Sequence, residues 1–154
     1  MYKNKIEEIY KKIKFLILAV CTLLFAYCNN PHKSNVIVLD KSISKIEVLD
    51  FHSTHRCITC NAIEANTKYT LNTYFTTELQ ENKITFRVIN VDKKENEEIA
   101  EKFKASGTAL ILNVIKKGKE TPINLTDFAF MNGNNKKEFS EKLKNTIHIA
   151  LKTL

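Results

Sequence analysis

The chain has 154 residues, of which 44% are hydrophobic and 27% are charged. This length allows one compact domain and excludes a multidomain enzyme or a repeat array, and the apolar fraction excludes general disorder. The 24 Lys and Arg against 17 Asp and Glu give a net charge of +7, but only Arg56 and Arg87 are arginines and the lysines are scattered among glutamates. Because the sequence has no clustered basic stripe, we do not expect it to bind nucleic acid.

The amino-terminal segment combines a basic stretch with a short apolar one. Residues 1–14 contain five lysines, and residues 15–26 (FLILAVCTLLFA) carry no charge. The uncharged run, about 14 residues ending at Cys28, falls short of the roughly 20 that span a bilayer as a helix. This pattern is typical of a signal peptide, so we expect export. A buried core helix fits less well, because lysines directly precede the apolar run.

The end of this segment leaves three fates open. Residues 24–28 (LFAYC) resemble a bacterial lipoprotein box, in which the chain is cleaved before Cys28 and that cysteine is lipidated. Tyr27 departs from the pattern, because the residue before the lipidated cysteine is usually small. Ala26 and Cys28 also fit a small-x-small site for cleavage after Cys28. Alternatively, the segment remains as an uncleaved anchor with its lysines inside.

We therefore expect three parts in the chain. These are a signal peptide or membrane anchor at 1–28, a tether at 29–35 and one folded domain at 36–154. The domain is expected on the periplasmic or cell-envelope side of a bacterial membrane, to which its amino terminus holds it.

The first half of the domain has the pattern of two strands, a helix and a third strand. Short runs rich in β-branched residues at 36–39 and 45–51 predict strands. From Cys57 to about Lys83 the chain lacks Gly and Pro and its apolar residues recur at helical spacing, which predicts a long helix, straight or kinked. Residues 84–91 alternate and are β-branched, which predicts the next strand.

The second half continues with a helix, a hairpin and a last helix. Residues 94–104 place apolar side chains on one helical face, and the nearly all-apolar run 108–115 predicts a central strand. A turn at 116–119 returns the chain as an edge strand at 120–125. Apolar residues that step by four then predict an amphipathic terminal helix. They are Phe139, Leu143, Ile147 and Leu151.

The chemical feature of the sequence is the pair Cys57 and Cys60, which follows a predicted strand and opens a predicted helix. The free N–H groups of a helix N-terminus favour a thiolate there and lower the pKa of the first cysteine. Positive charge on His55 and Arg56 acts in the same direction, so we expect both to stabilise the thiolate. Cys57 is then the nucleophile that attacks a disulfide, and Cys60 resolves the mixed disulfide.

Over residues 36–154 the chain resembles the thioredoxin-like superfamily. The resemblance rests on the strand ending in Asp50-Phe51, the C-x-x-C pair that opens a helix, and the order of the elements that follow. The string F-H-x-x-x-R-C-x-T-C also resembles a subgroup of small exported proteins. The resemblance implies an α/β fold, a three-layer α/β/α sandwich with a mixed central sheet, preceded here by an N-terminal apolar helix.

The chain departs from the superfamily's pattern close to the cysteines. Arg56 stands in the place of a tryptophan, and Ile58-Thr59 replaces Gly-Pro inside the motif. The family's cis-proline should fall near Thr108-Ala109, where the sequence has no proline, so we expect a trans bond there. Ile58, Thr59, Thr108 and Ala109 are accordingly expected to line a substrate groove of a different local shape.

Four further side chains have ordinary structural explanations. Asp50 precedes Cys57 by seven residues, one more than the family's buried acid usually does, so we assign it no proton-relay role. Glu64, one helical turn past the cysteine pair, is expected to be a solvated helix position. Phe128 and Phe130 are expected to pack in the core or to anchor a loop.

Three functions fit the cysteine pair. It can be redox-active, it can be a structural disulfide in a non-catalytic binding module, or it can bind copper or zinc together with His52 and His55. A loop this short stabilises a fold only weakly, which disfavours a purely structural disulfide. We favour an exported, membrane-tethered thiol-disulfide oxidoreductase, and we assign no metal site.

The partners follow from the same interpretation. The expected substrates are protein thiols or disulfides. The sequence has no cofactor-binding motif, so a redox partner protein has to supply or remove the electrons. We expect a monomer. Whether the chain oxidises, reduces or isomerises depends on its reduction potential, which the sequence does not determine.

Overall fold

The computed structural model describes residues 44–154. The predicted signal peptide or anchor, the tether, the lipidation site Cys28 and the strand at 36–39 lie outside the described residues. Within 44–154, no helix has the length and apolar character needed to cross a bilayer.

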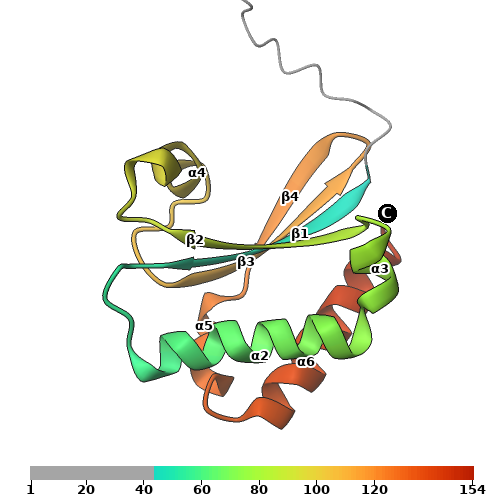
Figure 1. Cartoon of the computed structure of the whole chain (residues 1–154). Coiled ribbons are helices and arrows are strands. Elements are labelled where there is room, and N and C mark those ends of the chain that lie inside the picture. The colour runs from blue at the N-terminus through green and yellow to red at the C-terminus, as the bar shows by residue number, and fades with distance from the viewer. Residues whose placement is uncertain (1–43) are drawn as a thin grey trace, which may run out of the picture. The chain divides into compact units, whose positions relative to one another are not determined.

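The described part of the chain contains a mixed sheet with the strand order β2-β1-β3-β4 (Figure 1). β1 (Lys45–His52) pairs in parallel with β2 (Ile84–Asn90), and this pairing requires a crossover between them. β3 (Ala109–Lys116) runs antiparallel to β1, and β4 (Lys119–Asn124) forms a hairpin with β3. The predicted bounds of these four strands are correct to within one residue.

The crossover consists of α2 (Ile58–Tyr74) and α3 (Thr76–Gln80). A single long helix, straight or kinked, was expected here, and the chain breaks it at Phe75, whose φ of −134° and ψ of 29° are not helical. The Phe75 ring is fully buried and lies 4.9 Å, centroid to centroid, from the ring of His148. The break therefore occurs where a large side chain turns into the core.

Helices cover both faces of the sheet, as the three-layer prediction requires (Figure 1). α2 and the terminal helix α6 (Lys136–Leu151) lie on one face, and the short η2 (Lys94–Asn96) and α4 (Glu97–Lys102) lie on the other. Alternate residues of β1 pack into two hydrophobic cores, one on each face of the sheet. Ile46 and Val48 pack under α2 and α6, whereas Leu49 and Phe51 pack under α4.

One helix, α5 (Thr126–Asn132), was not predicted. It follows β4 directly, and the Asn124 Oδ1 accepts a hydrogen bond of 2.9 Å from the Thr126 amide, the first N–H of the helix. Phe128 packs on Phe139 with ring centroids 5.1 Å apart, as expected of a core residue, whereas Phe130 is exposed. At seven residues, α5 is too short to show a helical period in the sequence.

Candidate redox site

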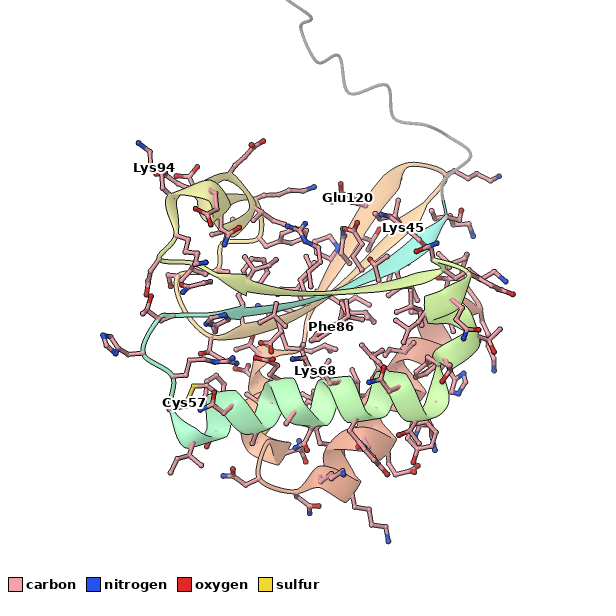
Figure 2. The ribbon with its side chains drawn as sticks, viewed as in Figure 1. Lys45, Cys57, Lys68, Phe86, Lys94 and Glu120 are labelled. Atoms are coloured by element: carbon pink, nitrogen blue, oxygen red, sulfur yellow. A yellow bond between two sulfur atoms is a disulfide. The ribbon has the colours of Figure 1, made fainter. Side chains whose placement is uncertain are left out.

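The two cysteines lie at the junction of β1 and α2, where the disulfide is visible beside the label of Cys57 in Figure 2. They form a disulfide with their Cα atoms 5.0 Å apart. Cys57 is exposed, whereas Cys60 is only 6% exposed. An external sulfur can therefore reach Cys57, and Cys60 is accessible mainly from within the protein.

Cys57 is also the N-cap residue of α2. Its Sγ accepts a hydrogen bond of 3.0 Å from the backbone amide of Cys60, one of the N–H groups that has no partner inside the helix. When the disulfide is reduced, the same amide and the helix dipole favour negative charge on this sulfur. The geometry predicted for the nucleophilic cysteine is therefore present.

The loop between β1 and α2 is held against the end of β2. The Thr54 amide donates to Asp92 Oδ2 at 2.6 Å, and Asn90 Nδ2 donates to Thr54 Oγ1 at 3.2 Å. The Val91 amide donates to the His52 carbonyl at 2.8 Å. The backbone hydrogen bond from Thr54 lowers the pKa of the Asp92 carboxyl, which keeps this anchor charged.

The two histidines of the loop lie on the side of Asp92. Positive charge on His55 or His52 adds a smaller favourable effect on the Asp92 carboxylate. His55 is exposed, and His52 Nδ1 lies 2.9 Å from the Ser53 carbonyl oxygen. Stabilisation of the Cys57 thiolate by His55 stays a prediction.

Arg56 turns inward, toward the buried side of the cysteine pair. Its side chain is 17% exposed, and one guanidinium nitrogen, Nη1, bonds to Glu64 Oε2. The other, Nη2, donates to the Cys60 carbonyl at 3.1 Å and lies 3.9 Å from Asp50 Oδ2. The charge of Arg56 thus lies among Glu64, Asp50 and the backbone of the resolving cysteine.

Asp50 occupies an inward position of β1 that the sequence pattern would give to an apolar residue. It follows Ile46 and Val48 at alternate positions of the strand, so it faces α2, and it has no exposed surface. Neither carboxylate oxygen has a hydrogen-bond partner. Burial raises the pKa of Asp50 to about 7; the Arg56 guanidinium opposes this shift and the Glu64 carboxylate adds to it.

This environment revises two sequence-based expectations. Asp50 is a buried acid next to the redox site even though it lies one residue farther from Cys57 than the superfamily pattern has it. Glu64 is not a solvated helix position, because its side chain is only 16% exposed and bonds both Arg56 and Lys68. Burial alone would raise the pKa of Glu64, but these two hydrogen bonds lower it, so the carboxyl is held ionised.

The residues predicted to line a groove lie in two places. Ile58 is 87% exposed directly beside Cys57. Thr59 is half-buried, and its Oγ1 accepts a hydrogen bond of 3.4 Å from Asn134 Nδ2. Asn66 Nδ2 also donates to the Gly133 carbonyl at 2.7 Å, so the turn between α5 and α6 packs on the first turns of α2. No pattern in the sequence predicts this contact.

Thr108 and Ala109 lie at the start of β3. Ala109 pairs with Phe51, so Thr108 and Ala109 lie at the end of the sheet from which the cysteine loop leaves. An open hollow of about 490 Å³ adjoins this end and is lined by both residues, by Gly107 and by Asp127. The described peptide bonds are all trans, including the one before Ala109, as expected.

The residues that sequence reasoning missed have recognisable signals in hindsight. Asp50 interrupts the inward apolar alternation of β1, and such an interruption marks a buried charge. Glu64 lies four residues after Cys60, one helical turn along α2.

Within residues 44–154, no three His, Cys, Asp or Glu side chains gather closely enough to hold a metal ion, and both thiols of the proposed ligand set are joined in the disulfide.

The comparison with solved structures finds matches to thioredoxins, each less than 25% identical to this chain. The germline-specific thioredoxin Deadhead of Drosophila melanogaster is 24% identical, with a TM-score of 0.42 over 68% of this chain and 79% of that chain. Mitochondrial thioredoxin 3 of Saccharomyces cerevisiae is 20% identical, with a TM-score of 0.39 over 60% of this chain and 79% of that chain. Fasciola hepatica thioredoxin is 22% identical, with a TM-score of 0.37 over 57% and 76%.

No protein-family model matches the sequence, and the search of curated proteins finds no match. The assignment of the fold rests on the strand order, with β1 and β2 parallel and β3 and β4 antiparallel, and on the cysteine pair between β1 and α2. The described strand order and the position of the cysteine pair are those that the predicted resemblance to the thioredoxin-like superfamily implies.

Proposed function

We propose that the chain is a thiol-disulfide oxidoreductase in which Cys57 is the nucleophile and Cys60 the resolving cysteine. The observation that carries the proposal is the asymmetry of the pair: Cys57 is exposed at the N-terminus of α2, and Cys60 is buried behind it. This arrangement exposes one sulfur to a partner and keeps the other for the intramolecular step.

The reaction in the oxidising direction has two steps. A substrate thiolate attacks Cys57 Sγ, the Cys57–Cys60 bond breaks, and Cys60 leaves as a thiolate that takes up a proton. A second substrate thiolate then attacks the substrate sulfur of the mixed disulfide and releases the Cys57 thiolate. The substrate loses two electrons and the cysteine pair gains them. The reverse sequence reduces a disulfide.

Asp50 is suited to exchange the proton of Cys60. It is buried on the α2 side, and Arg56 Nη2 contacts both the Asp50 carboxylate and the Cys60 carbonyl, so Asp50 lies near the backbone of Cys60. A pKa of about 7 lets the carboxyl gain and lose a proton at neutral pH. Replacement by Asn should slow the Cys60 step by on the order of a hundredfold and leave the attack on Cys57 less affected.

The surface around Cys57 supports protein substrates. Ile58 presents an exposed apolar side chain next to the reactive sulfur, and Met131 is exposed on α5 two residues before the turn that packs on α2. Thiol-disulfide exchange as written above needs no cofactor. A second redox protein therefore has to supply the electrons in the reducing direction or remove them in the oxidising one.

The decisive test uses three forms of the full chain. The unaltered protein should catalyse insulin reduction or the oxidation of a dithiol peptide. Cys60→Ser should accumulate a mixed disulfide on Cys57, and Cys57→Ser should do neither. If the unaltered protein has no activity against glutathione, insulin or a peptide and Cys60→Ser traps no partner, the chain is a non-catalytic binding module. Measuring the potential of the pair in a glutathione buffer then gives the direction.

The proposal also places the domain outside the cytoplasm, tethered to a bacterial membrane by its amino terminus. The support is the basic stretch and the charge-free run before Cys28. The three fates of this segment give different fractionation results. Lipidation predicts that Cys28→Ser loses incorporation of labelled palmitate, an uncleaved anchor predicts a membrane-bound chain of full mass, and cleavage after Cys28 predicts a free protein.

A further inference from the structure

The charged side chains on the α2 side of the redox site form one connected group. Arg56 bonds Glu64 through one nitrogen and, through the other, contacts both the Cys60 carbonyl and the Asp50 carboxylate. Glu64 in turn bonds Lys68, which is half exposed and lies farther along α2 (Figure 2). The group thus runs from a fully buried carboxylate to solvent.

The Arg56 guanidinium contacts Glu64 more closely than it contacts Asp50. Glu64 is hydrogen-bonded to the guanidinium, whereas Asp50 lies 3.9 Å from it, outside hydrogen-bond distance. Asp50 is the more deeply buried of the two carboxylates, and its oxygens have no other partner. Buried Arg56 Nε likewise lacks a hydrogen-bond partner. Glu64 therefore makes the stronger contact with the Arg56 guanidinium. Without Glu64, the buried Asp50 carboxylate would have this cation to itself.

We propose that Arg56 is a positioning residue that sets the charge of Asp50 beside the resolving cysteine, and that Glu64 limits this effect by competing for the same guanidinium. The inference rests on the proposed function, because the charge of Asp50 matters through the proton of Cys60. Arg56 stands where the superfamily has a tryptophan, so this chain has a positive charge at a position where the superfamily has an uncharged ring.

The other surroundings of Asp50 do not compete with this group. Its partners across the sheet are Val88 on β2 and Leu110 on β3, which are uncharged. Among the described residues, the charges that act on Asp50 are those of Arg56 from the loop and of Glu64 and Lys68 from α2. Burial has the largest effect on its pKa, and the effects of charge come from these three side chains.

The proposal predicts shifts of opposite sign from two substitutions. Arg56→Met removes the cation, so the pKa of Asp50 should rise by at least about one unit. Glu64→Gln removes the competing anion and frees the guanidinium, so the same pKa should fall by about half a unit or more. Arg56→Lys keeps the charge but offers a single nitrogen in place of the fork, and should give a smaller rise than Arg56→Met.

The measurement is the titration of the Asp50 carboxyl carbon by ¹³C NMR in the oxidised full-length chain, solubilised in a mild detergent and assigned with Asp50→Asn. The chain provides matched controls. Arg87→Met alters the other arginine, which is exposed on β2, and Glu138→Gln alters an ion-paired glutamate on α6. Neither control should move the titration. If both test variants shift it in the same direction, or neither shifts it, the proposal is wrong.

A second readout separates this inference from the proposed function. The pH midpoint for resolution of a mixed disulfide by Cys60 should move up in Arg56→Met and down in Glu64→Gln, in step with the NMR titration. A chain that resolves no mixed disulfide but shows the two opposite NMR shifts overturns the proposed function and keeps the charge assignment. If the two variants shift the NMR titration in opposite directions but leave the pH midpoint of resolution unchanged in an active chain, Arg56 has no role in the reaction.

Discussion

The loop that carries Cys57 lies between two aspartates in opposite environments. On the β2 side, Asp92 is exposed, accepts the Thr54 amide and has its pKa lowered by that hydrogen bond. On the α2 side, Asp50 is fully buried without a hydrogen bond, and burial raises its pKa to about 7. The first carboxylate fixes a loop at low cost, whereas the second is kept at an energetic cost that packing alone would not require. A group retained at such a cost is a candidate for function.

The largest expected effect is the contrast in stability between Asp50→Asn and Asp92→Asn. A raised folded-state pKa means that folded Asp50 binds more protons than the unfolded chain between about pH 4 and pH 7, so its contribution to stability falls as the pH rises through this window. Asp50→Asn should therefore raise the free energy of unfolding at pH 8 by about 2 to 4 kcal/mol and change little at pH 4.

Asp92→Asn should have the opposite sign. The lowered pKa of Asp92 means that its stabilisation is present above the unfolded-state pKa and is lost as the pH falls through the lower folded-state value. This variant should thus be less stable at pH 8 and equal to the unaltered chain in strong acid. Denaturant unfolding of oxidised Asp50→Asn at pH 8 and pH 4, and of oxidised Asp92→Asn at pH 8 and in strong acid, measures the two effects. If both variants changed the free energy of unfolding in the same direction at pH 8, the contrast between the two aspartates would be wrong.

The next effect comes from the close packing on the α2 side. A Cβ at Gly133 would lie 2.9 Å from the Ala129 carbonyl oxygen and 3.0 Å from Thr59 Cγ2. Gly133→Ala should therefore cost about 1 to 3 kcal/mol of unfolding free energy and disturb the turn next to the cysteines.

Gly107→Ala is the matched control on the other side of the loop. A Cβ there would meet Ser53 Oγ at 3.7 Å, an ordinary contact. Chemical or thermal unfolding should show little change for this variant. A smaller loss for Gly133→Ala than for Gly107→Ala would mean that the turn between α5 and α6 is not tightly packed on α2.

A smaller effect is expected from Asn90→Ala on the β2 side. Asn90 Nδ2 donates to Thr54 Oγ1, and its Oδ1 accepts the Asp92 amide at 3.0 Å. Loss of both bonds should destabilise the chain by about 0.5 to 1.5 kcal/mol and loosen the loop. Amide hydrogen exchange at Thr54 should become faster while exchange in α6 stays proportional to global stability. Unchanged exchange at Thr54 would contradict the anchoring role.

The smallest effect is expected from Lys68→Gln, at the solvent end of the α2-side group. Lys68, which is half exposed, forms an i,i+4 pair with Glu64, and such a pair contributes about 0.3 to 0.5 kcal/mol at low salt. Lys142→Gln, which breaks a similar pair with Glu138 on α6, is the control. Only Lys68→Gln should also raise the pKa of Asp50, and by less than Arg56→Met does. The same pKa shift in both variants would show that Lys68 acts only through the net charge.

The sequence predicted the strands and the cysteine pair well because each has a local signal. Alternating β-branched runs place β1 and β2, a glycine-containing turn places the β3–β4 hairpin, and residues stepping by four place α6. The C-x-x-C spacing after a strand predicts that Cys57 opens a helix, which the structure confirms by making it the N-cap of α2. Signals of this kind are carried by neighbours in the chain, so they survive without tertiary contacts.

The environments of the charged side chains had no such signal. From the sequence, Glu64 was expected to be solvated and Arg56 to lie beside the Cys57 thiolate. Only the packing of α2 under β1 brings both of them next to Asp50. Likewise, α5 is too short for periodicity, and its role becomes visible only when Gly133 is found against Thr59. Contacts between residues far apart in the chain depend on how faces of helices and strands meet.

By itself, the sequence determined that two cysteines, three residues apart, lie at the start of a helix, since this depends only on local spacing and helix capping. The tertiary structure alone decided how these sulfurs differ, because exposure of Cys57 and burial of Cys60 arise from the layers around them. It also decided that Asp50 is buried with a raised pKa and shares Arg56 with Glu64. The physical reason is that desolvation and ion pairing act through space, on groups brought together only when the sheet and helices pack.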